Sequence, residues 1–73
     1  MASSEREGVL WSLSARRSTA KCVLRAGSTL TELLILQDEE VAFRESFPDE
    51  LSARKRADAL QERLLQKGWK QAG

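Results

Sequence analysis

The spacing of apolar residues changes once along the chain, at Pro48. Before Pro48, apolar and polar residues alternate in short runs, a period of two that is typical of half-buried β-strands. After Pro48, apolar residues recur at steps of three and four, which is the stripe of an amphipathic helix. The pattern predicts an α+β fold of ββββα order, a four-stranded antiparallel β-meander followed by one C-terminal helix packed across one face.

The strands are separated by turn-forming residues. A polar break follows Ala15, a glycine-containing turn begins at Gly27, and a third turn is predicted at residues 38–39 or 37–40. We expect strands at about residues 9–15, 19–26, 30–37 and 41–47, and a helix within residues 49–69.

The predicted helix carries signals at both ends. Asp49 or Ser52 can cap its start. Gly68 is placed as the left-handed residue that follows a helix, and Trp69 would then fold back on Leu64. The inner stripe is expected to consist of Ala53, Ala57, Leu60 and Leu64.

Hairpin register predicts which side chains share a face of the sheet. In the first strand, Val9, Trp11 and Leu13 fall on one side. The last two strands are expected to place facing pairs under the helix: Leu36 with Val41, Leu34 with Phe43, and Leu30 with Phe47, with Glu32 opposite Glu45 as the polar exception.

The other face is then expected to carry a second apolar set: Val23, Leu33, Ile35 and Ala42. One helix cannot cover two faces, and an exposed apolar patch favours association. These four residues are therefore the candidate interface of a homodimer or partner complex. The alternative is that the twist of a small sheet lets long basic side chains cover them.

With 73 residues the chain has room for one domain, which we assign to residues 8–70. Residues 1–7 are expected to be a disordered arm and residues 71–73 a frayed end. A chain this short usually needs a disulfide, a metal or a partner for stability. It has one cysteine and no histidine, so we expect no disulfide, no metal and no cofactor, and oligomerisation is favoured.

The apolar runs are too short to cross a bilayer, and the first seven residues are polar, unlike a signal peptide. We therefore expect a soluble cytoplasmic protein with no membrane partner. The lone thiol suits a reducing compartment.

Three features carry side chains that could serve a catalytic or binding site. Asp38-Glu39-Glu40 is interpreted as a hairpin turn, because a calcium site needs more oxygen ligands from a longer loop. Cys22 has no histidine to deprotonate it and is interpreted as a small buried hydrophobe. Both tryptophans are assigned to the core. With no catalytic residues to name, we expect that the protein is not an enzyme.

The candidate ligand-binding residues are basic: Lys21, Arg25 and Arg44 on the face away from the helix, with Arg16 and Arg17 assisting at a strand connection. Cations among apolar residues suit single-stranded nucleic acid, whose phosphates meet the cations while its bases lie on apolar surface. The alternative is a set of bases paired with Glu32 and Glu45, on a protein-interaction or assembly module without a nucleic-acid role. The near-neutral charge balance weakens the nucleic-acid hypothesis.

The order of four strands and one C-terminal helix resembles the unit of Whirly proteins, PUR-type domains and positive-cofactor transcriptional coactivators. The resemblance covers residues 9–69 in topology alone, without the motifs of those families. It implies dimers that bind single-stranded nucleic acid on their sheets. Separately, W-x-L at residues 11–13, the turn between the last two strands and LLQKGW at residues 64–69 resemble short bacterial proteins of unassigned function. Fold alone does not fix function.

Overall fold

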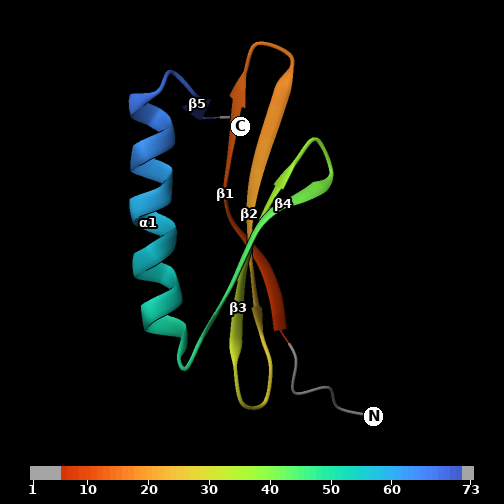
Figure 1. Cartoon of the computed structure of the whole chain (residues 1–73), viewed down its shortest axis with the longest axis vertical. Coiled ribbons are helices and arrows are strands. Elements are labelled where there is room, and N and C mark those ends of the chain that lie inside the picture. The colour runs from red at the N-terminus through yellow and green to blue at the C-terminus, as the bar shows by residue number, and fades with distance from the viewer. Residues whose placement is uncertain (1–5, 72–73) are drawn as a thin grey trace.

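The computed structural model describes residues 6–71, in which an antiparallel sheet carries one helix on one face (Figure 1). Most of the expected N-terminal arm and of the frayed C-terminus lies outside the described residues. The elements are β1 (Arg6–Ala15), β2 (Ser18–Ala26), β3 (Thr31–Gln37), β4 (Glu40–Phe47), α1 (Glu50–Gln66) and β5 (Lys70–Gln71). The strand order across the sheet is β4-β3-β2-β1-β5. The predicted α+β meander with a C-terminal helix is confirmed.

Two details extend the predicted fold at its ends. β1 begins at Arg6, so Arg6 and Glu7 belong to the sheet. After the helix, β5 returns the chain to the sheet and pairs with Leu13 and Ser14 of β1, a strand that the sequence pattern does not predict. Among residues 6–71, no helix combines the length and the apolar character needed to cross a membrane.

The helix begins and ends as predicted. Asp49 is its N-cap, and Oδ1 of Asp49 accepts a hydrogen bond of 2.7 Å from the backbone N–H of Ser52. At the other end, Gly68 adopts a left-handed φ of 106°. The N–H of Trp69 donates to the carbonyl of Leu64 at 3.1 Å, the long backbone bond of a Schellman ending. This ending turns the chain back and brings Trp69 against the core.

The core lies between the sheet and α1. Its buried cluster consists of Trp11, Leu13, Ala20, Cys22, Leu24, Leu33, Ile35, Ala53 and Ala57. Of the predicted helical stripe, the two alanines are fully buried, and Leu60 and Leu64 pack partly buried against the cluster. The expected core positions of both tryptophans and of Cys22 are confirmed.

The register between β3 and β4 corrects the predicted faces of the sheet. Leu36 lies opposite Val41, as predicted, but a β-bulge at Ala42 then adds one residue to β4. An extra residue moves the side chains that follow it to the other face. The observed pairs are Leu36 with Val41, Ile35 with Phe43, Leu33 with Glu45 and Thr31 with Phe47, so the predicted pairs Leu34 with Phe43 and Leu30 with Phe47 are wrong.

Two of the predicted interface residues are on the wrong face, because the prediction inferred the faces of β3 from an unbulged pairing with β4. Leu33 and Ile35 lie in the core beneath α1, and their assignment to the uncovered face is wrong. The expected pairing of Glu32 with Glu45 is also wrong, since Glu45 lies on the helix side. There Oε1 of Glu45 is 3.3 Å from Nε of Arg56, which belongs to α1.

A second bulge occurs at Leu10 of β1. Val9 lies opposite Val23, whereas Trp11 lies opposite Cys22, so Leu10 has no partner on β2. Val9, predicted to share a side with Trp11, therefore lies on the face away from the helix. The two strands with bulges, β1 and β4, lie on either side of β2 and β3, which pair with each other without a register shift.

Candidate functional site

We call the face of the sheet that α1 does not cover the open face. The cross-strand registers arrange its side chains in three rows. Read from β1 to β4, the rows are Glu7, Arg25, Glu32 and Ser46; Val9, Val23, Leu34 and Arg44; and Ser12, Lys21, Leu36 and Val41.

The middle of the open face is apolar and hollowed. Val23 and Leu34 are buried, with 8% and 4% of their surface exposed, although no helix covers them. Val9 and Val41, on the flanking strands, are 57% and 52% exposed. A shallow depression of about 370 Å³ lies among these four residues and Leu36. The open face therefore has two buried apolar residues at its centre and an exposed valine on each outer strand.

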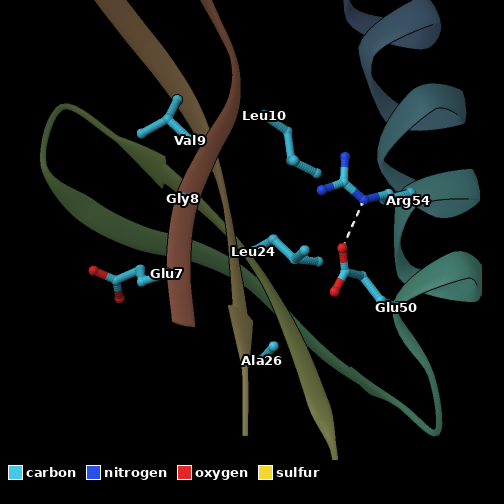
Figure 2. A pocket seen from close by; sticks show the side chains of 8 residues that line it. All are labelled: Glu7, Gly8, Val9, Leu10, Leu24, Ala26, Glu50 and Arg54. Atoms are coloured by element: carbon cyan, nitrogen blue, oxygen red, sulfur yellow. Dashed lines mark hydrogen bonds and ion pairs between the residues drawn. The ribbon is translucent and has the colours of Figure 1, made fainter. Parts of the chain in front are cut away.

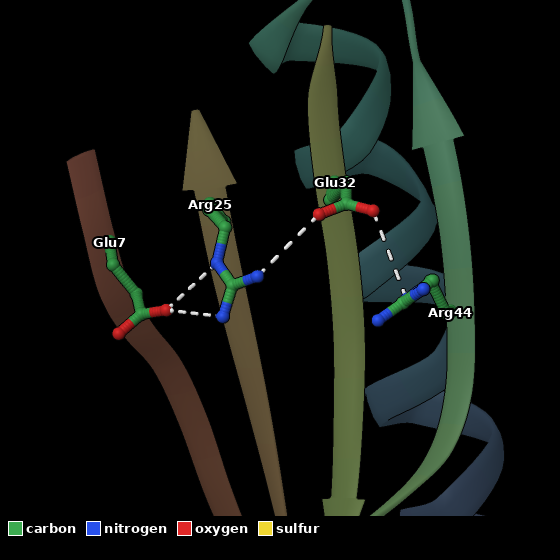
Figure 3. Close-up of polar contacts among 4 residues, drawn as sticks. All are labelled: Glu7, Arg25, Glu32 and Arg44. Atoms are coloured by element: carbon green, nitrogen blue, oxygen red, sulfur yellow. Dashed lines mark hydrogen bonds and ion pairs between the residues drawn. The ribbon is translucent and has the colours of Figure 1, made fainter. Parts of the chain in front are cut away.

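Four charged side chains cross the open face as a continuous ladder of alternating sign (Figure 3). Both Nε and Nη2 of Arg25 lie 3.0 Å from Oε2 of Glu7. On its other side, Nη1 of Arg25 lies 3.7 Å from Oε1 of Glu32, and Oε2 of Glu32 lies 3.8 Å from Nε of Arg44. The four side chains are 30–61% exposed, and their charges cancel. We call these four residues the charge ladder.

The structure brings together only some of the predicted basic residues. Arg25 and Arg44 belong to the charge ladder, and Lys21 lines the depression beside Arg25. Arg16 and Arg17 instead form the β1–β2 hairpin tip, at the opposite end of β2 from Arg25. The five cations therefore do not make one patch.

Of the predicted apolar interface residues, Val23 alone lies within the open-face depression. Ala42 is exposed at the bulge of β4. The residues that the sequence reasoning missed are Glu7, Val9, Leu34, Leu36 and Val41. The regular spacing of Val41 and Phe43 hides the bulge of β4, so no local signal in the sequence points to these residues.

The acidic run at the β3–β4 connection has a structural role. Asp38 and Glu39 have positive φ angles of 52° and 72°, the conformation of a tight hairpin turn. Oδ1 of Asp38 accepts a 3.0 Å hydrogen bond from the N–H of Thr19, and the N–H of Asp38 donates to the carbonyl of Thr19 at 3.0 Å. These bonds fasten the turn to β2. Within residues 6–71, no three potential metal ligands come together.

The lone thiol is isolated from solvent. Cys22 has no exposed surface, and burial raises its pKa from 9.0 to about 11. A thiol with a raised pKa is almost wholly protonated at neutral pH and is a poor nucleophile.

A cavity of about 400 Å³ lies between the start of α1 and the strands β1 and β2 (Figure 2). Leu10 and Leu24 extend into it, and its outer wall carries the ion pair of Glu50 and Arg54, with Nε and Oε2 3.0 Å apart. Its lining holds no thiol, hydroxyl or amine to act as a nucleophile. Chemically it is a recess of mixed polarity, in which two leucines face a paired charged rim.

The chain was compared with protein-family models, with curated proteins and with solved structures, and no match was found in any of the three comparisons.

Proposed function

We propose that this domain is a non-enzymatic assembly module whose open face packs against the open face of a second copy. The observation that carries the proposal is the charge ladder beside an exposed apolar patch. Half-exposed valines favour association, because packing them against a partner removes apolar surface from water. The ladder restricts which partner geometry is acceptable, since like charges placed face to face repel.

A two-fold axis parallel to the strands, between β2 and β3, brings opposite charges together, and apolar side chains together, at the centre of the open face. Such an axis reverses the strand order, so β2 of one copy lies over β3 of the other. Arg25 then faces Glu32 of the second copy, and Glu32 faces Arg25 of the second copy. In the next row, Val23 faces Leu34 of the second copy. Two charge pairs and two apolar contacts thus come from one symmetry operation.

The other symmetric arrangement is unfavourable. A two-fold axis running across the strands through the middle row would place Arg44 against Arg44 of the second copy. It would also bring Arg25 against Lys21 of the second copy. Both juxtapositions are repulsive, so electrostatics selects the axis parallel to the strands.

Binding of single-stranded nucleic acid on the open face is the competing proposal. It would use Lys21, Arg25 and Arg44 as phosphate contacts. The carboxylate of Glu32 lies between Arg25 and Arg44, and that of Glu7 pairs with Arg25 from the other side, so both acids compete with a phosphate for these cations. A phosphate backbone would have to displace both acids, and the ladder therefore favours a protein surface of matching charge.

The proposal is tested by a pair of charge reversals, Arg25→Glu and Glu32→Arg, analysed separately and mixed by sedimentation equilibrium. Each variant alone repels its own copy across the interface and should be monomeric. In the mixture, the glutamate introduced at position 25 of one chain faces the arginine introduced at position 32 of the other. The native Glu32 of the first chain likewise faces the native Arg25 of the second, so a heterodimer should form. The Arg25–Glu32 pair within one chain cannot produce this rescue, because each variant has lost that pair and mixing does not restore it within either chain.

Arg63→Glu, on the exposed surface of α1, is the matched control and should dimerise like the wild type. Val41→Asp should weaken the dimer without touching the ladder. Circular dichroism of each variant confirms folding. A wild-type chain that stays monomeric at high concentration, or a mixture that stays monomeric while both variants are folded, would overturn the proposal. Wild-type monomers that bind a single-stranded oligonucleotide, with loss of binding in Arg25→Glu, would support the competing one.

A further inference from the structure

A second surface lies away from the charge ladder, where the tip of the β1–β2 hairpin approaches the end of α1 and β5 (Figure 1). A hollow of about 500 Å³ opens there. It is lined by Ser14, Ala15, Arg16, Lys67, Gly68, Trp69 and Lys70. We call it the basic hollow, because its lining has three cations and no acid.

The three cations are available to a ligand. Arg16, Lys67 and Lys70 are all exposed. Within residues 6–71, none of the three forms an ion pair, in contrast to Arg25 and Arg44 of the charge ladder. The carbonyl end of α1 contributes about half a negative charge nearby, which three full positive charges outweigh. The basic hollow is therefore an electropositive concavity.

An aromatic ring lies in the same wall. Trp69 is half buried, packs against the core and lines the basic hollow. Its backbone is held by the Schellman ending, because its N–H donates to the carbonyl of Leu64. Packing against the core restricts the ring itself, so it can stack a planar group at little entropic cost.

We infer that the basic hollow binds a nucleotide unit, with the phosphate held by Arg16, Lys67 and Lys70 and the base placed against Trp69. Phosphate contacts from Lys and Arg supply most of the affinity of sequence-independent binding, and stacking adds to it. The unit can be a free nucleotide or one residue of a single strand. The site lies apart from the open face and does not depend on dimerisation.

Fluorescence anisotropy of a labelled oligo-deoxythymidine at low ionic strength is the test, with unlabelled AMP and inorganic pyrophosphate as competitors. The affinity should fall with salt with a slope of about −0.7 in the log–log plot, because the three cations contact one phosphate of a single strand. Lys67→Glu and Lys70→Glu should each weaken binding by about tenfold. Lys55→Glu, the same exchange on the exposed surface of α1, should change it by less than about twofold.

The competitors separate the two sources of the ligand. If AMP displaces the labelled strand at about the same nucleotide concentration as the unlabelled oligonucleotide does, the hollow binds a mononucleotide. If only the unlabelled oligonucleotide displaces it, the hollow binds a strand. Trp69→Leu should weaken binding of AMP by about tenfold and leave pyrophosphate unchanged, since stacking is worth about 1–3 kcal/mol per base. Absence of oligonucleotide and AMP binding, or equal loss in Lys55→Glu and Lys67→Glu, would overturn the inference.

Discussion

The indole Nε1 of Trp11 donates a 3.1 Å hydrogen bond to the backbone carbonyl of Ala57, which joins the first strand to the middle of the helix. Both residues are buried, at 7% and 0% exposure. The indole thus fills space between the sheet and α1 and also fixes the position of the helix along the strand. A buried N–H left without a partner would be costly, so the two requirements are met together.

Trp11→Phe should lower the free energy of unfolding by about 2–3 kcal/mol, because it removes this hydrogen bond and part of the buried ring. Urea denaturation followed by circular dichroism measures the loss. Trp69→Phe, at a half-buried ring near the surface, is the control and should cost less than about 1 kcal/mol. Equal losses in the two variants would contradict a special role for the bond to Ala57.

The β3–β4 turn offers a stabilising substitution. Glu39 adopts a φ of 72°, which costs an L-residue roughly 1–2 kcal/mol and glycine almost nothing. Part of that gain is lost, since glycine is more flexible in the unfolded chain. Glu39→Gly should therefore raise the free energy of unfolding by about 0.5–1 kcal/mol, measured by urea denaturation.

The neighbouring carboxylate is the control for this substitution. Glu40 is the first residue of β4, and Glu40→Gly should destabilise the protein by about 0.5–1 kcal/mol, because glycine is unfavourable in a strand. Asp38 is left unchanged in both variants, since its side chain accepts the hydrogen bond from Thr19. If both glycine variants shift stability in the same direction, strain at Glu39 is not the cause.

The order of elements could be predicted from the sequence, whereas the faces of the sheet could not. Period two, the turn residues and the helix signals at Asp49 and Gly68 are local, and each predicts its element correctly. A bulge depends on which strand lies alongside, and alternation hides it. Regular pairing with Cys22 and Leu24 of β2 places Ile35 and Leu33 in the core, and the extra residue at Ala42 brings Phe43 to the same face, which the unbulged register does not predict.

The candidate sites depend on long-range pairing in the same way. Arg25 and Arg44 lie away from the helix as predicted, but their partner Glu7 falls in the expected disordered arm. The basic hollow combines Arg16 with Lys67 and Lys70, residues about fifty positions apart. They meet because β5 returns the chain to β1, and two residues are too few to show a strand pattern.

The N-cap residue Asp49 should make the free energy of unfolding decrease at acidic pH. Hydrogen bonding from Ser52, chiefly from its backbone N–H, lowers the pKa of Asp49 below its ordinary value of 3.8. A carboxyl with a lowered folded pKa contributes stability above its unfolded pKa and loses it as the pH falls through the folded pKa. The urea midpoint should therefore decrease below about pH 4, in part through this group.

Two substitutions separate the charge of Asp49 from its capping role. Asp49→Asn keeps an oxygen that accepts from Ser52 but cannot titrate, so it should retain the cap and reduce the acid dependence. Asp49→Ala should lower the urea midpoint at neutral pH and reduce the acid dependence as well. If Asp49→Asn loses stability with acid as steeply as the wild type, the titrating group lies elsewhere.

The buried thiol of Cys22 should make the free energy of unfolding decrease at alkaline pH, whereas Asp49 makes it decrease at acidic pH. The pKa of Cys22 is raised from 9.0 to about 11 by burial, so the folded state holds its proton more tightly than the unfolded chain. Stability is then fully present below pH 9.0 and is lost as the pH rises through the folded value. The loss should reach about 2 kcal/mol near pH 11, as expected for two pKa units in a single group.

Cys22→Ala is the variant that tests this loss. It should cost about 1 kcal/mol at neutral pH through a small cavity, but its stability should fall less between pH 9 and pH 11 than that of the wild type.

Native Cys22 should also react with a thiol reagent only as fast as the protein opens, since no part of its surface is exposed. Urea added below the unfolding transition should therefore accelerate labelling. Rapid labelling of the folded protein without urea would show that the thiol is accessible and that its raised pKa does not come from burial in the core.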